Sequence, residues 1–109
     1  MQIRIRTHSD NLEVHAQGAL TTEAAAELLD EVSKEMAPRP RDIALDLGAI
    51  DTISAGALPY VFRIRQQAES SQRRMTVTAV SLPVRRLLDL TNVTSKLEGV
   101  TKPSVLTTR

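Results

Sequence analysis

Ser54 and Gly56 have the spacing closest to a catalytic arrangement in this sequence. A serine next to a strand-to-helix turn can serve as the nucleophile of a hydrolase when it occupies the pattern Gly-x-Ser-x-Gly. Thr52 occupies the position of the first glycine in that pattern. The two histidines, His8 and His15, lie much earlier in the chain, and no sequence pattern connects them with Ser54. We therefore expect the protein not to be an enzyme.

The sequence does not support a metal or cofactor site either. The chain contains no cysteine, which excludes thiol catalysis, disulfides and zinc sites built on thiolates. His8 and His15 are too far apart for a helical metal pair. The four glycines are scattered along the chain and do not form a phosphate-binding loop. We expect neither a bound metal nor a cofactor.

Length and composition predict one compact domain over residues 1–109. Hydrophobic residues make up 41% and charged residues 25% of the chain, as in ordinary globular proteins. The net charge is only +1, which gives no basic excess to neutralise the phosphates of a nucleic acid. The only aromatic residues are Tyr60 and Phe62, too few to stack on a series of bases. The apolar runs are too short to span a bilayer, and Met1-Gln2-Ile3-Arg4 does not open a signal peptide. We expect a cytoplasmic protein that neither binds nucleic acid nor inserts into membranes.

The strands that must position these residues follow from strict alternation of apolar and polar side chains. This alternation predicts strands over 2–6, 12–17, 43–47 and 75–79. The turn residues Ser9-Asp10-Asn11 join the first two strands into a hairpin. Gly48 is expected to mark the point where the third strand leaves the sheet.

Three helices are predicted between and after the later strands. The first follows Thr21 and Thr22, either of which can cap it, and ends before Pro38. The second begins near Ser54, and the third follows Ser81. The expected apolar stripes are Ala25, Leu28, Leu29, Val32 and Met36 on the first helix, Ala57, Val61, Ile64 and Ala68 on the second, and Val84, Leu87 and Leu88 on the third, which also carries Leu90. The tail from Asn92 carries only a weak pattern.

The order of elements predicts the fold class. A hairpin followed by alternating helices and strands is typical of a mixed sheet with helices packed against it. We therefore predict an α/β sandwich with a mixed sheet of four to five strands.

Two segments of the chain resemble one protein family. The strand Leu45-Asp46-Leu47 is followed by Ser54-Ala55-Gly56 at the start of the second helix, and the third helix reads Ser81-Leu82-Pro83-Val84-Arg85-Arg86-Leu87-Leu88-Asp89-Leu90-Thr91. Both are similar to the STAS domain of bacterial anti-sigma factor antagonists, and the order of elements agrees over roughly residues 3–100. The resemblance implies a STAS-like fold and a role in protein binding without a cofactor.

The resemblance also implies a phosphorylation switch, which this sequence alters. In these antagonists an anti-sigma factor that is a serine kinase phosphorylates the Ser or Thr directly before the glycine, and the unmodified form binds that kinase and frees a sigma factor. Here that position is Ala55, which has no hydroxyl. Ile53 stands where the family has an aspartate, unless a shorter loop displaces that aspartate to Asp51. Ser54 is a candidate acceptor, and the alternative that we favour is an N-cap for the second helix.

The expected partner is an anti-sigma factor of the serine-kinase type, bound by a monomer or weak homodimer. The alternative is a STAS accessory subunit of a transport ATPase or stress-signalling complex, which binds its partner without a phosphorylation switch. Leu58 and Phe62 lie off the predicted stripe, so they form either an exposed contact or the edge of the core. The expected partner-binding residues are Asp51, Thr52, Ser54, Ala55, Gly56, Leu58, Phe62 and Arg65.

Overall fold

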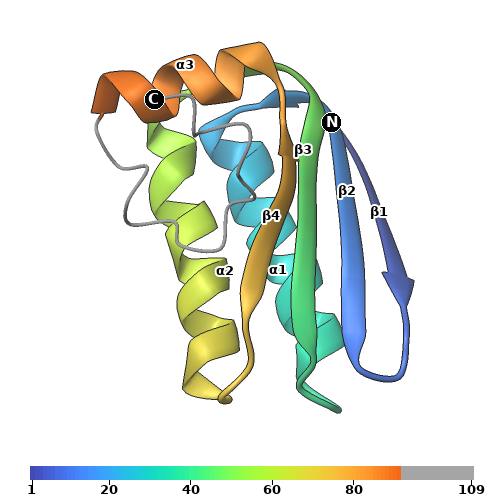
Figure 1. Cartoon of the computed structure of the whole chain (residues 1–109). Helices are drawn as coiled ribbons and strands as arrows, with labels where there is room; N and C mark the ends of the chain where they lie inside the picture. The colour runs from blue at the N-terminus through green and yellow to red at the C-terminus, as the bar shows by residue number, and fades with distance from the viewer. Residues whose placement is uncertain (92–109) are drawn as a thin grey trace.

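A computed structural model of the chain describes residues 1–91, and the tail from Asn92 lies outside the described residues. The elements follow the predicted order (Figure 1). They are β1 (Gln2–Thr7), β2 (Asn11–Leu20), α1 (Thr22–Met36), β3 (Asp42–Ile53), the 3-10 turn η1 (Ala55–Ala57), α2 (Leu58–Ser70), β4 (Met75–Val80) and α3 (Leu82–Thr91).

The described strands form a four-stranded mixed sheet in the order β1-β2-β3-β4. β1 and β2 pair antiparallel, whereas β2 with β3 and β3 with β4 pair parallel. Each parallel step advances in the same direction, and parallel crossovers are right-handed, so α1 and α2 lie on the same face of the sheet. In Figure 1, α1 is partly hidden behind the strands and α2 lies to the left of β4. The predicted α/β fold with a mixed sheet is confirmed.

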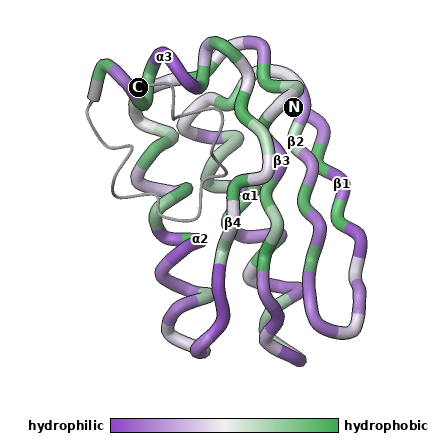
Figure 2. Tube along the Cα trace, viewed as in Figure 1, coloured by the Kyte–Doolittle hydropathy of each residue, from purple (hydrophilic) through white to green (hydrophobic). Residues whose placement is uncertain are grey.

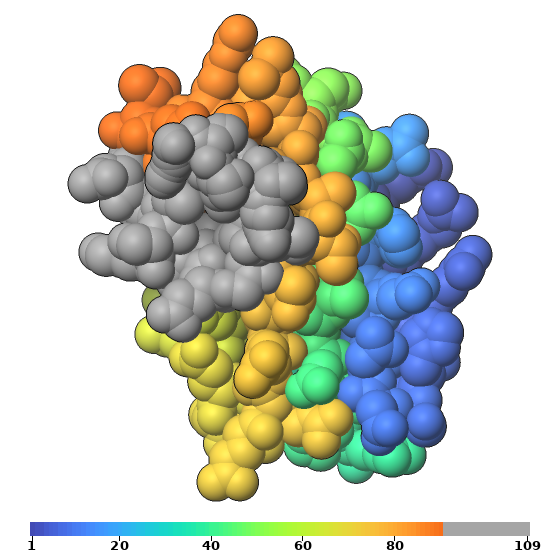
Figure 3. Space-filling model, in the orientation of Figure 1, coloured from blue at the N-terminus to red at the C-terminus, as the bar shows by residue number. Residues whose placement is uncertain are grey.

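The core lies between the sheet and these two helices. Alternate residues of β2, β3 and β4 point inward and are buried, and Figure 2 shows the corresponding apolar (green) stretches along the strands and along α2. The opposite face of β1, β2 and β3 carries no described helix in the view of Figure 3, where the blue and green strands lie side by side at the surface. The largest fully buried side chains include Leu12, Leu20, Leu28, Ile43, Leu45, Ile50, Ile64 and Leu88.

Helix α1 begins and ends where the sequence predicts. The Thr21 hydroxyl accepts a hydrogen bond from the Ala24 amide at 3.1 Å, which satisfies one amide that the first turn leaves without a helical partner. The helix ends at Met36, ahead of Pro38. Of the predicted stripe, Leu29 is only partly buried.

Strand β3 continues past Gly48, so the prediction that Gly48 ends the strand is wrong. The register with β2 shifts here, because His15 pairs with Asp46 whereas Gln17 pairs with Ala49. One extra residue on β3 is a β-bulge, and the Asp46 carboxylate stabilises it by accepting a hydrogen bond from the Gly48 amide at 2.8 Å. The strand therefore resumes beyond the bulge.

Helix α3 packs against the core through its predicted stripe. Val84 and Leu88 are buried and Leu87 packs partly against the core. Leu90, outside that stripe, is 83% exposed. A spacing of two residues from Leu88 turns its side chain about 200° around the helix axis, away from the sheet.

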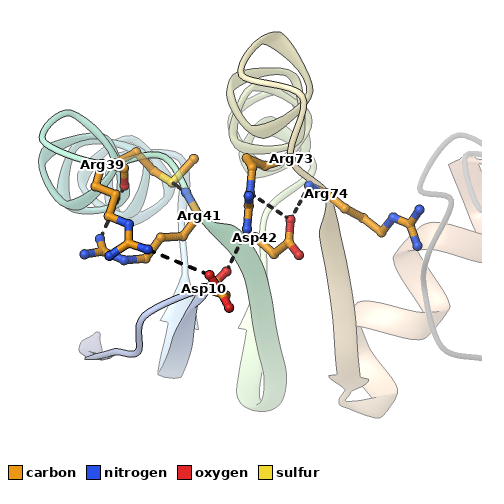
Figure 4. Close-up of polar contacts among 7 residues, drawn as sticks. Asp10, Arg39, Arg41, Asp42, Arg73 and Arg74 are labelled. Atoms are coloured by element: carbon orange, nitrogen blue, oxygen red, sulfur yellow. Dashed lines mark hydrogen bonds and ion pairs between the residues drawn. The ribbon is translucent and has the colours of Figure 1, made fainter.

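Charged residues tie three connections together at the lower end of the molecule (Figure 4). The Asp42 carboxylate accepts from the Arg74 amide at 3.0 Å and pairs with the Arg73 guanidinium at 3.2 Å. Arg73 also donates to the Asp10 carbonyl at 3.0 Å, and Arg39 pairs with the Asp10 carboxylate at 3.8 Å. These contacts join the β1–β2 turn, the loop before β3 and the turn before β4.

Candidate functional site

The exposed residues predicted to bind a partner lie together after the bulge of β3. Register shifts a second time between Gly18 and Ala19 of β2, which leaves Asp51 as an extra residue on β3. Asp51, Thr52 and Ser54 are exposed, as are the first two residues of η1. We call the surface formed by Asp51, Thr52, Ser54, Ala55 and Gly56 the β3–α2 ridge.

Backbone contacts hold this ridge against the start of α1. The Ser54 amide donates to the Leu20 carbonyl at 3.1 Å, and the Ala57 amide donates to the Ser54 carbonyl at 2.9 Å. Gly56 lies directly against the Thr22 hydroxyl, and a side chain at this position would collide with it. The ridge is therefore held to the end of β2 by a hydrogen bond and packs closely on the first residue of α1.

Ser54 occupies an N-cap position without making the capping bond. Its backbone is extended before η1, but its side chain accepts no hydrogen bond from the turn. The N-cap of α2 itself is Ala57, with Pro59 in the first turn where a missing amide is tolerated. The prediction that the Ser54 hydroxyl caps the second helix is therefore wrong, and this hydroxyl is exposed.

Leu58 and Phe62 belong to the edge of the core. Leu58 is 7% exposed, which contradicts an exposed apolar contact at this residue. Phe62 packs partly buried against the core and keeps part of its side chain exposed, so its role in binding a partner stays a prediction. Leu58 precedes Val61 by three residues, which places it only about 60° from Val61 around the helix axis, so a slightly wider apolar face includes it. Arg65 lies further along α2, where it pairs with Glu69 at 3.0 Å.

The sequence did not predict that both histidines lie close to carboxylates on the uncovered face of the sheet. His15 Nδ1 lies 3.1 Å from Asp46 Oδ2, and His8 Nε2 lies 3.7 Å from Glu13 Oε1. The register brings His15 beside Asp46, and only knowledge of that strand pairing would have revealed the contact. Within residues 1–91, no group of three or more His, Cys, Asp or Glu residues has a metal-binding arrangement.

The helices of the described region are all too short or too polar to cross a lipid bilayer. The longest of them is the 15-residue α1, which is amphipathic, with an apolar face and an acidic face.

Comparisons with solved structures show where this fold occurs. The anti-sigma factor antagonist SpoIIAA in its unphosphorylated form superposes with a TM-score of 0.75 at 10% identity, over 93% of this chain and 100% of SpoIIAA. An anti-sigma factor antagonist from Mycobacterium paratuberculosis gives 0.75 at 18% identity, over 89% of this chain and 82% of that one. Mglu superposes with a TM-score of 0.61 at 19% identity over 68% of this chain. The matched part covers only 18% of the length of Mglu.

Sequence comparison agrees with this structural likeness. None of the curated proteins matches the sequence. A family model described as "Mlab, STAS domain" matches residues 3–100, which includes every strand and helix described above except the first residue of β1. The element order, the sheet topology and this match together show that the chain belongs to the STAS domain family.

Proposed function

We propose that this protein is a non-enzymatic regulatory module that binds an anti-sigma factor of the serine-kinase type through the β3–α2 ridge and thereby frees a sigma factor. The observation that carries this proposal is an exposed and anchored ridge on a fold shared with anti-sigma factor antagonists. A surface that is fixed before binding loses little conformational entropy when a partner docks. The proposal implies a cytoplasmic location and a monomer or weak homodimer.

Ala55 distinguishes this ridge from one controlled at the usual phosphoacceptor. A phosphate at the start of a helix meets amides without helical partners, and it adds nearly two negative charges that can repel a docked partner. Ala55 carries no hydroxyl for that modification. The exposed Ser54 hydroxyl, which makes no capping bond, stays the candidate acceptor.

Affinity capture from the native host tests the docking surface. The bait is the unmodified chain, compared with Ala55→Arg on the ridge and with Ser71→Arg as the control, since Ser71 is exposed beyond the opposite end of α2. We expect the unmodified chain and Ser71→Arg to retain an anti-sigma factor of the serine-kinase type that Ala55→Arg loses. Retention by all three baits, or copurification of a small ligand with no protein, would contradict the proposal.

Phosphorylation is tested separately with the captured kinase and ATP. Mass spectrometry of the unmodified chain, Ser54→Ala and Ala55→Ser shows whether a phosphate is transferred and to which residue. Phosphate on Ser54 that disappears in Ser54→Ala identifies the displaced acceptor. Phosphate on Ala55→Ser alone shows that the kinase recognises this ridge and that the natural chain lacks the switch.

The second candidate function is an accessory STAS subunit that binds a transport ATPase or stress-signalling complex without a phosphorylation switch. Ala55 is the observation that favours it, because a permanent contact needs no acceptor hydroxyl. The same capture experiment separates the two functions by the class of protein that is lost with Ala55→Arg. A transport ATPase that the unmodified chain retains and Ala55→Arg loses supports the accessory role.

A further inference from the structure

A groove runs between the edge strand β1 and helix α1, on a different side of the molecule from the β3–α2 ridge. It has a volume of about 300 Å³. Its apolar wall comes from β1 and the residue before it, and its acidic wall comes from α1. The lining residues are Met1, Ile3, Ile5, Glu27, Glu31 and Glu35.

The two walls of the groove match each other in spacing. Alternate residues of a strand are about 6.8 Å apart, and residues four apart on a helix are about 6.0 Å apart along its axis. Three apolar side chains on one wall therefore face three carboxylates on the other over a similar length. Figure 1 shows β1 and α1 running in the same direction, from the top of the view to the bottom.

The carboxylates of the acidic wall have no ion-pair partner within residues 1–91, although the Arg41 guanidinium reaches the Glu35 backbone carbonyl at 3.3 Å. Glu27, Glu31 and Glu35 make no side-chain hydrogen bond or ion pair there, and Lys34 pairs with Asp30 at 3.4 Å instead. Glu31 and Glu35 are nevertheless partly buried. Carboxylates in such a groove favour a cationic ligand, because their mutual repulsion is relieved when a positive charge lies between them.

The apolar wall is also incomplete. Among the described strands β1 has a neighbour on one side only, so alternate backbone amides and carbonyls along its outer edge have no strand to pair with. Ile3 and Ile5 are only partly buried, although their strand partners Ala16 and Val14 are fully buried. A further strand beside β1 would extend the sheet over the acidic wall and cover both isoleucines.

A second copy of this chain fits that position poorly. Antiparallel pairing of two β1 strands centred on Ile5 would set Arg4 of each copy opposite Arg6 of the other, on the uncovered face of the sheet. It would also bring isoleucines, and no cations, over the acidic wall. Like charges directly opposite each other destabilise strand pairing, so self-association through this edge is disfavoured.

We infer that this groove binds an extended segment of a protein partner, which adds as a strand to the outer edge of β1 and places Lys or Arg at alternate positions over Glu27, Glu31 and Glu35. Three alternate residues span about 14 Å of strand, close to the roughly 12 Å from Glu27 to Glu35 along the helix. The pairing supplies backbone hydrogen bonds, and the alternate cations supply specificity. This site is independent of the proposed function of the ridge.

The probe for this site is the peptide acetyl-Lys-Val-Lys-Val-Lys-Val-amide, titrated into the full chain by NMR. We expect saturable shifts confined to the amides of β1 and the acidic face of α1. A peptide of the same composition in the order Val-Val-Val-Lys-Lys-Lys should bind at least tenfold more weakly, since it cannot set three cations on one face. Equal binding of the two peptides, shifts elsewhere, or no binding would overturn the inference.

Charge-matched variants test the acidic wall. Glu27→Gln/Glu31→Gln/Glu35→Gln keeps the shape of the groove and should weaken binding about tenfold, the combined effect of three partly exposed ion pairs. The control Glu23→Gln/Asp30→Asn/Asp89→Asn removes the same net charge outside the groove and should change the affinity less than twofold. Equal effects in both variants would show attraction to net charge alone and contradict the site.

Backbone methylation tests strand addition. One peptide carries N-methyl groups on its lysines and another carries them on its valines, so each blocks the amides of one strand edge. A peptide that adds to β1 pairs through one edge only, so one methylated peptide should lose binding and the other should keep it. Loss in both, or in neither, would contradict strand addition. Concentration-dependent dimers that compete with the peptide would instead identify a second copy as the occupant.

Discussion

Gly56 is required by a contact between two segments that are distant in the sequence. A Cβ atom at this position would overlap the Thr22 hydroxyl. Thr22 is the first residue of α1, whereas Gly56 lies in η1. The glycine therefore lets the ridge approach the first turn of α1.

Gly56→Ala should lower the free energy of unfolding by about 1–3 kcal/mol, because the added methyl group forces these two segments apart. The second substitution Thr22→Ala removes the hydroxyl that causes the overlap, so Thr22→Ala/Gly56→Ala should regain most of this loss. Urea unfolding of both variants and of Thr22→Ala measures the coupling. Equal losses from Gly56→Ala in the two backgrounds would show that this contact is not the cause.

Leu58 is a stability residue, and substitutions there are unsuitable as tests of docking. Leu58→Ala should lower the free energy of unfolding by about 2–5 kcal/mol, because the side chain is buried and leaves a cavity. Ala55→Arg, three residues earlier and exposed, should change it by less than about 0.5 kcal/mol. Thermal unfolding of the two variants distinguishes them. A stable Leu58→Ala protein would contradict the placement of Leu58 in the core.

The helix starts show how far residue-level prediction reached. The preference of threonine for the N-cap predicted a cap at Thr21 or Thr22, and the structure assigns it to Thr21, which precedes a regular α-helix. Ser54 has the same preference but precedes a 3-10 turn, whose hydrogen bonds connect residues three apart and reorient the free amides. The turn arises from the way the ridge packs on α1, which periodicity along one segment does not encode.

At the scale of the element, this difference between the two caps can be measured. Thr21→Ala should lower the free energy of unfolding by about 1 kcal/mol, since it removes the side-chain acceptor of the Ala24 amide. Ser54→Ala should change it by less than about 0.5 kcal/mol, because no capping bond is lost. Urea unfolding of both variants provides the comparison. Similar losses would show that the Ser54 hydroxyl caps its turn in solution.

The strands were predicted more completely than the ridge, for a related physical reason. Alternation identified the inward residues of β2 and of the first half of β4, because a strand paired in regular register keeps a period of two. That period ends in β4 at Thr78, an extra residue between the pairs Leu45–Val77 and Asp46–Ala79. β3 breaks that period at its two bulges, so Ile50 returns to the core while Asp51 and Thr52 face outward. Bulges depend on the partner strands, and a glycine in one sequence cannot distinguish a bulge from a strand end.

At the scale of the whole molecule, Asp42 connects parts of the chain that close the lower end of the sheet. Its carboxylate holds the turn before β4 through the Arg74 amide and the Arg73 guanidinium (Figure 4). The Arg73 guanidinium also donates a hydrogen bond to the backbone carbonyl of Asp10. These residues are far apart in the sequence, and local patterns of polar and apolar residues do not predict contacts at such distances. The long-range contacts restrict the three connections to one arrangement.

Asp42→Ala should lower the free energy of unfolding by about 1–2 kcal/mol, because it removes the acceptor of the Arg74 amide and the ion pair with Arg73. Asp42→Asn keeps one oxygen as an acceptor and should lose less than half of that amount. The control Asp30→Ala removes an exposed pair with Lys34 within one helix, which contributes only about 0.3–0.5 kcal/mol. Urea unfolding at low and high salt separates the ionic part, because screening should diminish the difference between Asp42→Asn and the unmodified chain. Equal losses from Asp42→Ala and Asp30→Ala would mean that the cluster contributes no more than an ordinary surface pair.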